Sequence, residues 1–344
     1  DIITFNSVLA AFDSSGQWQR AIDLISAATT AKLEPTLITY NAIVSACAGC
    51  GQWESAFGML NTMDQQKVEC SVISYTSAIS ACAQGGEWQQ ALVTFDTMVQ
   101  LSVPQNAFTY NAAISACETA AEWERAILLV VQLASTRQIG DIITFSTLLS
   151  AGGKAGAWEH AWQYFCDLPE MRLERNTITF NSMIDAFDKG GEWKRAVWLL
   201  EQDLRGNLSD KSGRLVDVIG FNAAISACEE AAKWEEALEL LKQLQGALQA
   251  DVISFNAAIS CCETSTRWRE ALMVFLDAQS NAVHPNEVTY NAVINACKTG
   301  HWSQSLVLLA QSPQWTLVSC NGLLSGCEKG GLWWMASSLL SKMC

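Results

Sequence analysis

The sequence predicts an all-α protein, an α-solenoid of stacked helix-turn-helix repeats, and two observations carry this prediction. A tryptophan recurs at a constant interval of 35 residues, and apolar residues with helical spacing lie on both sides of it. A fixed period of this length is typical of arrays in which each unit packs only against its neighbours. The repeated tryptophans are Trp18, Trp53, Trp88, Trp123, Trp158 and Trp193, followed at less regular intervals by Trp234, Trp268, Trp302 and Trp333.

The first half of each unit is expected to form a helix with one apolar face. In the first unit Phe5, Val8, Leu9 and Phe12 follow the i, i+3, i+4, i+7 spacing of a helical stripe. Thr4 is the candidate N-cap, because its hydroxyl could satisfy an unpaired backbone N–H at the helix start.

The second half of each unit is expected to form another helix, which the tryptophan opens. Gly16 breaks the first helix, and Trp18, Ala21, Ile22 and Ile25 then repeat the helical spacing. A small residue three positions after the tryptophan would let two helices approach closely. This alanine recurs as Ala56, Ala91, Ala126, Ala161, Ala196, Ala237, Ala271 and Ala336.

We expect one solenoid domain over residues 1–344. The sixth unit carries a six-residue excess, placed in a loop within Gly206–Gly213, and the ninth is about five residues short around Gln311–Trp315. Neither end shows a polar capping helix, so we expect a segment of a longer array or ends that partners cover. The ten expected repeats are about 2–36, 37–71, 72–106, 107–141, 142–176, 177–217, 218–251, 252–286, 287–316 and 317–344.

The composition fits a packed protein and argues against membrane insertion and non-specific binding of nucleic acid. Hydrophobic residues make up 50% of the chain, which is enough for a buried core. No apolar run reaches about 18 residues, the minimum for a membrane-spanning helix. The 35 acidic residues outnumber the 21 lysines and arginines, and the net charge of −14 is unfavourable for contact with phosphates.

Neither the histidines nor the cysteines indicate a catalytic or metal site. His160, His284 and His301 belong to no metal-binding pattern, and Cys47 and Cys50 form a CxxC without a second pair. No glycine-rich phosphate loop occurs either, so we expect no enzyme activity, no cofactor and no metal. Seven of the thirteen cysteines share one repeat position, where a small buried residue in a reducing compartment is expected: Cys47, Cys82, Cys117, Cys228, Cys262, Cys297 and Cys327.

The repeat unit resembles the pentatricopeptide repeat. The resemblance rests on the period of 35, the opening Ile38-Thr39-Tyr40-Asn41 and its counterparts, the alanine of the second helix, and closing pairs such as Pro285-Asn286. It covers residues 2–344 and indicates a P-type-like array with an atypical Gly-x-Trp consensus. The tetratricopeptide repeat fits poorly, because its tryptophan lies in the first helix.

This resemblance implies a function that composition alone does not. It implies sequence-specific binding of single-stranded RNA, one base per repeat, without catalysis. It also implies a role in RNA processing, stability or translation in the mitochondrion or chloroplast.

The resemblance also implies which residues read each base. In this family the asparagine after the aromatic residue and the last residue of the unit face one base, which implies a tract of roughly 5′-YCAUAUUYY-3′. The pairs are Asn6 with Thr36 (pyrimidine), Asn41 with Ser71 (C), Thr76 with Asn106 (A), Asn111 with Asp141 (U), Ser146 with Asn176 (A), Asn181 with Asp217 (U), Asn222 with Asp251 (U), Asn256 with Asn286 (pyrimidine) and Asn291 with Thr316 (ambiguous).

Two further sets of residues follow from the resemblance. The residue three before each asparagine is expected to stack between bases: Ile3, Ile38, Ile73, Phe108, Ile143, Ile178, Ile219, Ile253 and Val288. Lysines late in the first helix are expected near the phosphates: Lys154, Lys189, Lys298 and Lys329.

Two alternatives stay open. The asparagines could serve structure by bonding local backbone, although Thr76 and Ser146 both occur with a closing asparagine, a co-variation that favours base reading. The chain could instead be a protein-binding scaffold, for example a subunit of a large organellar complex, because an acidic groove fits a basic partner. The acidic residues expected there are Glu118, Glu229, Glu230, Glu263 and Glu328.

Overall fold

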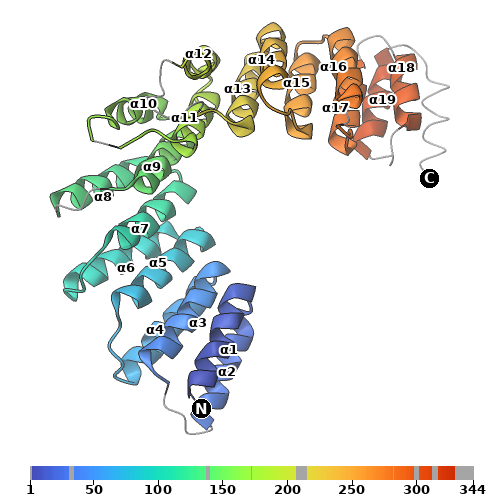
Figure 1. Cartoon of the computed structure of the whole chain (residues 1–344). Helices are drawn as coiled ribbons and strands as arrows, with labels where there is room; N and C mark the ends of the chain where they lie inside the picture. Colours follow the sequence, from blue (N-terminus) through green and yellow to red (C-terminus); the bar gives the residue numbers. More distant parts are fainter. Residues whose placement is uncertain are drawn as a thin grey trace. The chain divides into compact units, whose positions relative to one another are not determined.

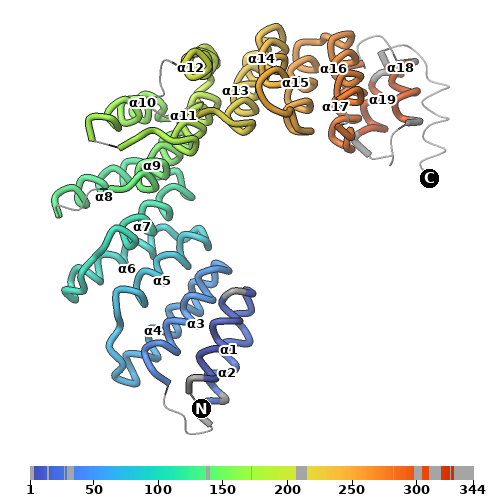
Figure 2. Tube along the Cα trace, viewed as in Figure 1, coloured from blue at the N-terminus to red at the C-terminus, as the bar shows by residue number. Residues whose placement is uncertain are grey.

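The computed structural model describes most of the chain (Figure 1). The described residues are 2–30, 35–136, 140–171, 173–206, 215–281, 283–297, 302–311 and 317–329. The expected loop within Gly206–Gly213, the shortened segment around Gln311–Trp315 and the second helix of the tenth unit lie largely outside these residues. Figure 2 follows the backbone of the chain from N-terminus to C-terminus.

Every regular element of the described residues is a helix, and the helices alternate as the repeats predict. The first helices are α1 (Ile2–Ser15), α3 (Leu37–Gly49), α5 (Val72–Gly85), α7 (Ala107–Thr119), α9 (Ile142–Lys154), α11 (Thr177–Lys189), α13 (Val218–Glu230), α15 (Val252–Thr264), α17 (Glu287–Cys297) and α19 (Leu317–Lys329). The second helices are α2 (Trp18–Thr30), α4 (Trp53–Gln65), α6 (Trp88–Gln100), α8 (Trp123–Ser135), α10 (Trp158–Asp167), α12 (Trp193–Leu204), α14 (Trp234–Ala247), α16 (Trp268–Ser280) and α18 (Trp302–Gln311). The predicted all-α solenoid class is confirmed.

The chain packs as two compact units, residues 1–174 and 175–344. In the first unit, α1, α3, α5, α7 and α9 pack side by side in that order, and Figure 1 shows α3, α5 and α7 as neighbours. In the second unit, α11, α13, α15, α17 and α19 do the same. Within the described part of each unit, second helices contact first helices rather than one another. Each unit therefore presents a continuous row of first helices.

The turn between the two helices of a repeat uses a left-handed residue two positions before the tryptophan. A positive φ is unfavourable for residues with a Cβ and favours glycine, which explains the recurring glycine of the sequence pattern. The chain uses alanine or threonine at three of the described turns. The left-handed residues of these turns are Gly16, Gly51, Gly86, Ala121, Gly156, Gly191, Ala232 and Thr266.

The repeated tryptophans from Trp18 to Trp268 are half-buried, and at several of them the next repeat stacks on the indole ring. The ring of Trp123 lies 4.7 Å from that of His160, centroid to centroid. The guanidinium of Arg267 lies 4.6 Å from the ring of Trp234, a cation–π contact. The tryptophan therefore contributes to the packing between successive repeats as well as opening its own helix.

The alanines and cysteines of the repeat occupy the core. Ala56, Ala91 and Ala126 are fully buried, and the seven register cysteines are buried as predicted. Burial raises the pKa of the Cys117 thiol to about 11 and that of Cys228 to about 12. At ordinary pH these thiols are neutral, so they behave as small apolar groups.

The predicted N-cap of the first helix is wrong. α1 begins at Ile2, so Thr4 lies inside the helix as its third residue. In the later repeats the cap is the residue that closes the preceding unit: the Asn106 side chain accepts from the Thr109 backbone N–H at 3.0 Å. The closing residue adopts extended backbone, which a capping residue requires and a helical residue lacks.

None of the described helices combines the length and the apolar character that crossing a membrane requires.

Candidate RNA-binding face

Among the described residues, those expected to close a base-reading pair lie at the N-cap of the next first helix. In Asp141, for example, the carboxylate oxygen Oδ1 accepts from the Thr144 backbone N–H at 2.8 Å. Each such residue is thereby fixed at the start of a helix. The described N-caps of this set are Thr36, Ser71, Asn106, Asp141, Asn176, Asp217 and Asp251.

The asparagine of one repeat reaches the closing residue at the start of the next helix. In five of the expected pairs the asparagine amide nitrogen donates to that residue. The bonds are Asn41 to Ser71 (3.4 Å), Asn111 to Asp141 (3.3 Å), Asn181 to Asp217 (2.9 Å), Asn222 to Asp251 (3.3 Å) and Asn256 to Asn286 (3.4 Å). The structure therefore brings these expected partners together side by side on neighbouring first helices.

A third side chain completes this arrangement, and the sequence reading did not anticipate it. In four repeats the third residue of the next first helix donates its hydroxyl proton to the asparagine carbonyl oxygen. These contacts are Thr39 to Asn6 (2.9 Å), Ser74 to Asn41 (2.6 Å), Thr144 to Asn111 (2.6 Å) and Thr289 to Asn256 (2.6 Å). We call the asparagine, the closing cap and this hydroxyl the polar triad. Its sequence signal is a Ser or Thr three residues after the closing residue, found after every closing residue except Asp217, which Gly220 follows; this is a variant of the capping-box spacing.

In two further expected pairs the contact runs through the hydroxyl of the next first helix. Thr76 reaches the next helix through the Thr109 hydroxyl at 2.9 Å, and Thr109 in turn contacts Asn106. In the first pair, Thr36 and Asn6 both contact the hydroxyl of Thr39.

Ser146 differs further, because it is buried and its hydroxyl donates to the Ile143 carbonyl of its own helix at 2.9 Å. Its expected partner Asn176 belongs to the other unit and caps α11. Asn291 lies on α17, and its expected partner Thr316 is outside the described residues.

The residues expected to stack on bases are exposed. Their exposed fractions run from 56% for Ile143 to 75% for Phe108. The described members of this row are Ile38, Ile73, Phe108, Ile143, Ile178, Ile219, Ile253 and Val288. The next residue along each helix is buried, Thr39 after Ile38 for instance. Three residues apart on a helix, Ile38 and Asn41 lie on the same side. The side chain of Ile3 is outside the described residues.

Carboxylates flank the expected phosphate contacts. Lys154 on α9 pairs with Glu118 on α7, nitrogen to oxygen, at 3.1 Å, and Lys189 pairs with Asp185 one turn earlier on α11. Lys298 and the side chain of Lys329 lie outside the described residues. Both described lysines are therefore engaged with acidic partners on or beside the row of first helices.

Two closing aspartates have lowered pKa values. Burial by itself would raise the pKa of Asp141, but hydrogen bonds from the Thr144 backbone and hydroxyl and from the Asn111 amide more than offset it. The same balance, with Ser254 and Asn222, lowers the pKa of Asp251. Both groups are therefore ionised at neutral pH, and an ionised carboxylate can only accept hydrogen bonds.

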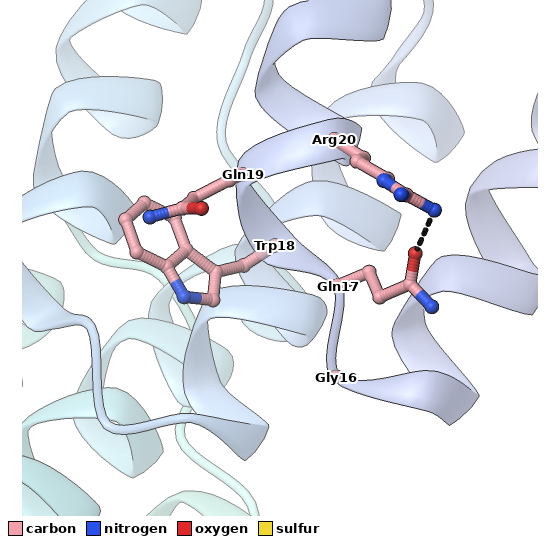
Figure 3. Close-up of a pocket in the computed structure, with 5 residues that line it drawn as sticks. All are labelled: Gly16, Gln17, Trp18, Gln19 and Arg20. Carbon is pink, nitrogen blue, oxygen red and sulfur yellow. Dashed lines mark hydrogen bonds between the residues drawn. The ribbon is translucent and has the colours of Figure 1, made fainter.

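Three hollows of the surface are lined by other described residues. One of about 310 Å³ is lined by Gly16, Gln17, Trp18, Gln19 and Arg20, where Arg20 donates to Gln17 at 2.8 Å (Figure 3). It contains none of the expected base-reading or stacking residues. In the described residues no group of three or more histidines, cysteines or carboxylates could hold a metal ion.

The geometry defines a class of protein: an array of helical hairpins whose first helices present a repeated polar triad beside an exposed apolar residue. Family models match most of the chain. The "PPR repeat family" matches residues 35–84, 71–118, 140–189 and 250–299, the "Pentatricopeptide repeat domain" matches 1–50, and the "PPR repeat" matches 178–202, 219–247 and 318–344. The chain belongs to the pentatricopeptide repeat family.

Solved structures share its fold. The crystal structure of the pentatricopeptide repeat protein PPR10 from maize is 18% identical, with a TM-score of 0.68 over 99% of this chain and 54% of that one. PPR10 in complex with an 18-nt psaJ RNA element is also 18% identical, with a TM-score of 0.53 over 99% of this chain and 53% of that one. The chain thus spans about half the length of these proteins. No curated protein sequence matches it.

Proposed function

We propose that the chain binds single-stranded RNA along its first helices, one base per repeat, with the tract roughly 5′-YCAUAUUYY-3′. The observation that carries the proposal is the exposed apolar residue beside each polar triad. An apolar side chain such as Ile38 or Phe108 gains nothing from exposure to water. Three residues away, Asn41 or Asn111 offers polar groups held in place by the neighbouring repeat. A stacked base with a hydrogen-bonding edge satisfies both.

The chemistry of the closing residue supports the expected base preferences. The ionised Asp141 can accept the N3–H of uracil but offers no proton to the bare N3 of cytosine. The Ser71 hydroxyl can donate to cytosine N3, so Asn41 with Ser71 suits C. The Asn111 amide uses one of its two N–H groups on Asp141, and the other is left for the base.

The acidic surface limits the affinity that we expect. The expected phosphate-contacting lysines are paired with Glu118 and Asp185, and RNA has to compete with these partners. Binding should therefore be modest and should weaken steeply with salt. We infer no catalysis, because the proposed function requires only recognition, and we place its role in RNA processing, stability or translation in the mitochondrion or chloroplast.

A protein-binding scaffold is the second candidate, and the acidity of the second unit favours it. Acidic residues gather late in α11, α13 and α15, three helices that pack side by side. They are Asp185 and Asp188 on α11, Glu229 and Glu230 on α13, and Glu263 on α15. A basic segment of a partner protein, within a large organellar complex for example, would be complementary to these carboxylates.

Fluorescence anisotropy distinguishes the two candidates. We would titrate the chain into labelled RNA carrying the sequence CCAUAUUCC and into a scrambled RNA of equal composition, over a series of salt concentrations. Preference for the first RNA, with G favoured in place of A when Asn106 and Asn176 are changed to Asp, is the expected result. If neither RNA binds at low salt, RNA recognition by this chain is wrong and the scaffold becomes the better candidate.

A further inference from the structure

Three repeats carry the same base-reading pair, asparagine with aspartate, but differ in the hydroxyl that follows. The pairs are Asn111 with Asp141, Asn181 with Asp217, and Asn222 with Asp251. The third residue of the next first helix is Thr144 in the first case, Gly220 in the second and Ser254 in the third. This natural series separates the contribution of the hydroxyl from that of the pair.

The complete triad holds its asparagine from both sides. Thr144 donates to the Asn111 carbonyl oxygen at 2.6 Å, and the Asn111 amide nitrogen donates to Asp141. An amide held in this way cannot rotate by 180° without placing its carbonyl oxygen against a carboxylate and its N–H₂ against the hydroxyl proton. The amide group that remains for a base is therefore an N–H in a fixed direction.

The repeat with Gly220 lacks this constraint. The carbonyl oxygen Oδ1 of Asn181 is buried and has no hydrogen-bond partner among the described residues. A Cβ added at Gly220 would lie 2.6 Å from that oxygen, so the amide occupies space that the threonine side chain fills elsewhere. The Asn181 nitrogen also lies closer to Asp217, at 2.9 Å, than the 3.3 Å found in the other two pairs.

The repeat with Ser254 is intermediate. Its hydroxyl donates to Asp251 at 2.8 Å, and the carbonyl oxygen of Asn222 is also buried without a partner among the described residues. Unlike Gly220, the serine still has a hydroxyl on the same helix position. A rotation about its χ1 angle could direct that hydroxyl to the asparagine.

We propose that the third residue of each first helix is a positioning residue that sets how sharply the preceding repeat discriminates its base. This inference rests on the proposed function. Asn111 with Asp141 is the discriminating uracil reader, Asn222 with Asp251 is weaker, and Asn181 with Asp217 is permissive. An amide without the hydroxyl partner can turn its carbonyl oxygen toward the base and accept from the amino group of cytosine, so uracil and cytosine bind more equally.

The test measures the affinity ratio of uracil over cytosine at single positions of the RNA. With the whole chain and the RNA CCAUAUUCC, changing nucleotide 4 to C should weaken binding about tenfold, as a mismatch does. Changing nucleotide 6 to C should weaken it about threefold or less. Thr144→Val should lower the uracil-over-cytosine ratio at nucleotide 4 to the value found at nucleotide 6, and should leave the ratio at nucleotide 7 unchanged. Thr144→Ser keeps the hydroxyl and should retain most of the ratio at nucleotide 4.

Gly220→Ser should increase discrimination at nucleotide 6, a result that simple destabilisation of the protein could not produce. The colliding atom is the end of the flexible Asn181 side chain, so the serine can be accommodated, and the ratio at nucleotide 6 should rise about threefold. Thr147→Val is the matched control, because that hydroxyl donates to the Ile143 carbonyl within α9. Its ratios should equal those of the unchanged protein.

Three outcomes would overturn the inference. RNA binding with equal ratios at nucleotides 4 and 6 would overturn it and leave the proposed function intact. The inference would also be overturned if Thr144→Val and Thr147→Val changed the uracil-over-cytosine ratio at nucleotide 4 equally. Failure of the unchanged protein to bind any RNA would overturn the proposed function and this inference with it.

Discussion

Asn111 and Asp141 are thirty residues apart in the sequence and are joined by a hydrogen bond of 3.3 Å between amide nitrogen and carboxylate oxygen. The bond connects successive repeats, because Asn111 lies on α7 and Asp141 caps α9. The pair thus has a structural role in holding neighbouring first helices in register, alongside its proposed role in reading a base. The two roles are compatible, because a hydrogen bond between repeats also holds the side chain in one orientation, and a ligand is recognised best by side chains held in this way.

Phe108→Ala tests the stacking row. Phe108 is 75% exposed, so its truncation should change the free energy of unfolding by less than about 0.5 kcal/mol. Stacking of a base on an aromatic ring contributes about 1–3 kcal/mol, so RNA affinity should fall about fivefold or more. Anisotropy titration and denaturant unfolding measure the two effects.

Leu128→Ala is the matched control for Phe108→Ala. Leu128 is 60% exposed on the second helix α8 and lies outside the expected stacking row. It should leave affinity unchanged. Equal loss in the two variants would contradict a specific role of the row.

Glu118→Gln tests the competition for Lys154. The Glu118 carboxylate accepts from both Lys154 and the Ser150 hydroxyl, at 3.1 and 2.6 Å. An exposed ion pair of this kind is worth about 0.2–1 kcal/mol, so freeing the lysine should raise RNA affinity about two- to threefold. One additional phosphate contact should also steepen the dependence of log affinity on log salt concentration by about 0.7.

Glu201→Gln removes the same charge from the pair with Arg205, beside the end of the second helix α12. It should change affinity less than Glu118→Gln and should leave the salt dependence unchanged. If both variants raise affinity equally, the effect comes from net charge and the assignment of Lys154 to a phosphate is wrong.

The periodic features of the fold could be predicted from the sequence because each is a local rule repeated many times. The tryptophan opens the second helix, the alanine after it is buried, and the residues three before each asparagine are exposed. Helical spacing of apolar residues predicts the two helices of each repeat, and the resemblance to the repeat family predicts the exposed row. The repeat boundaries and the single solenoid domain stay predictions.

The polar contacts between repeats could not be predicted in the same way. Thr4 was expected to cap its helix, yet the third residue of a first helix bonds an asparagine about 33 residues earlier, as Thr144 bonds Asn111. Local spacing says which residues share a helix face but not how two helices register against each other. The burial of Ser146 could not be predicted for the same reason, because it depends on how neighbouring helices pack around that residue.

Thr266→Gly tests the left-handed turn between α15 and α16. Thr266 has a φ of 57°, a conformation that costs a residue with a Cβ about 1–2 kcal/mol. Glycine removes this cost but loses more chain entropy on folding, so we expect a net gain of about 0.5–1 kcal/mol in the free energy of unfolding. Denaturant unfolding followed by circular dichroism measures it.

Gly191→Ala is the reverse control at the equivalent turn between α11 and α12. Gly191 has a φ of 69°, and an added Cβ would meet nothing within 4 Å, so only the backbone conformation is tested. This variant should lose about as much stability as Thr266→Gly gains. If Thr266→Gly instead destabilises the protein, the contacts of the threonine side chain stabilise the fold by more than its backbone strain costs.

Asp188 should make the stability of the second unit depend on pH. Burial, followed by repulsion from Glu230 and Asp185, raises the pKa of Asp188 to about 6, although Ser226 and Lys189 act in the opposite direction. Because the folded pKa lies above the unfolded one, the folded state binds the proton more tightly. Stability should therefore rise as the pH falls from about 7 to about 4, apart from the other groups that titrate there.

Asp188→Asn isolates this contribution. The amide has no charge to bury, so the variant should be more stable than the unchanged protein at pH 7.5 by about 1 kcal/mol, after allowance for solvent screening of a half-buried group. The difference should shrink as the pH falls toward 4, because Asp188 takes up its proton in the folded state at about pH 6 and in the unfolded state only at about pH 3.9. Denaturant unfolding of both proteins across this pH range measures the difference, and a constant difference would show that folding does not raise the pKa of Asp188.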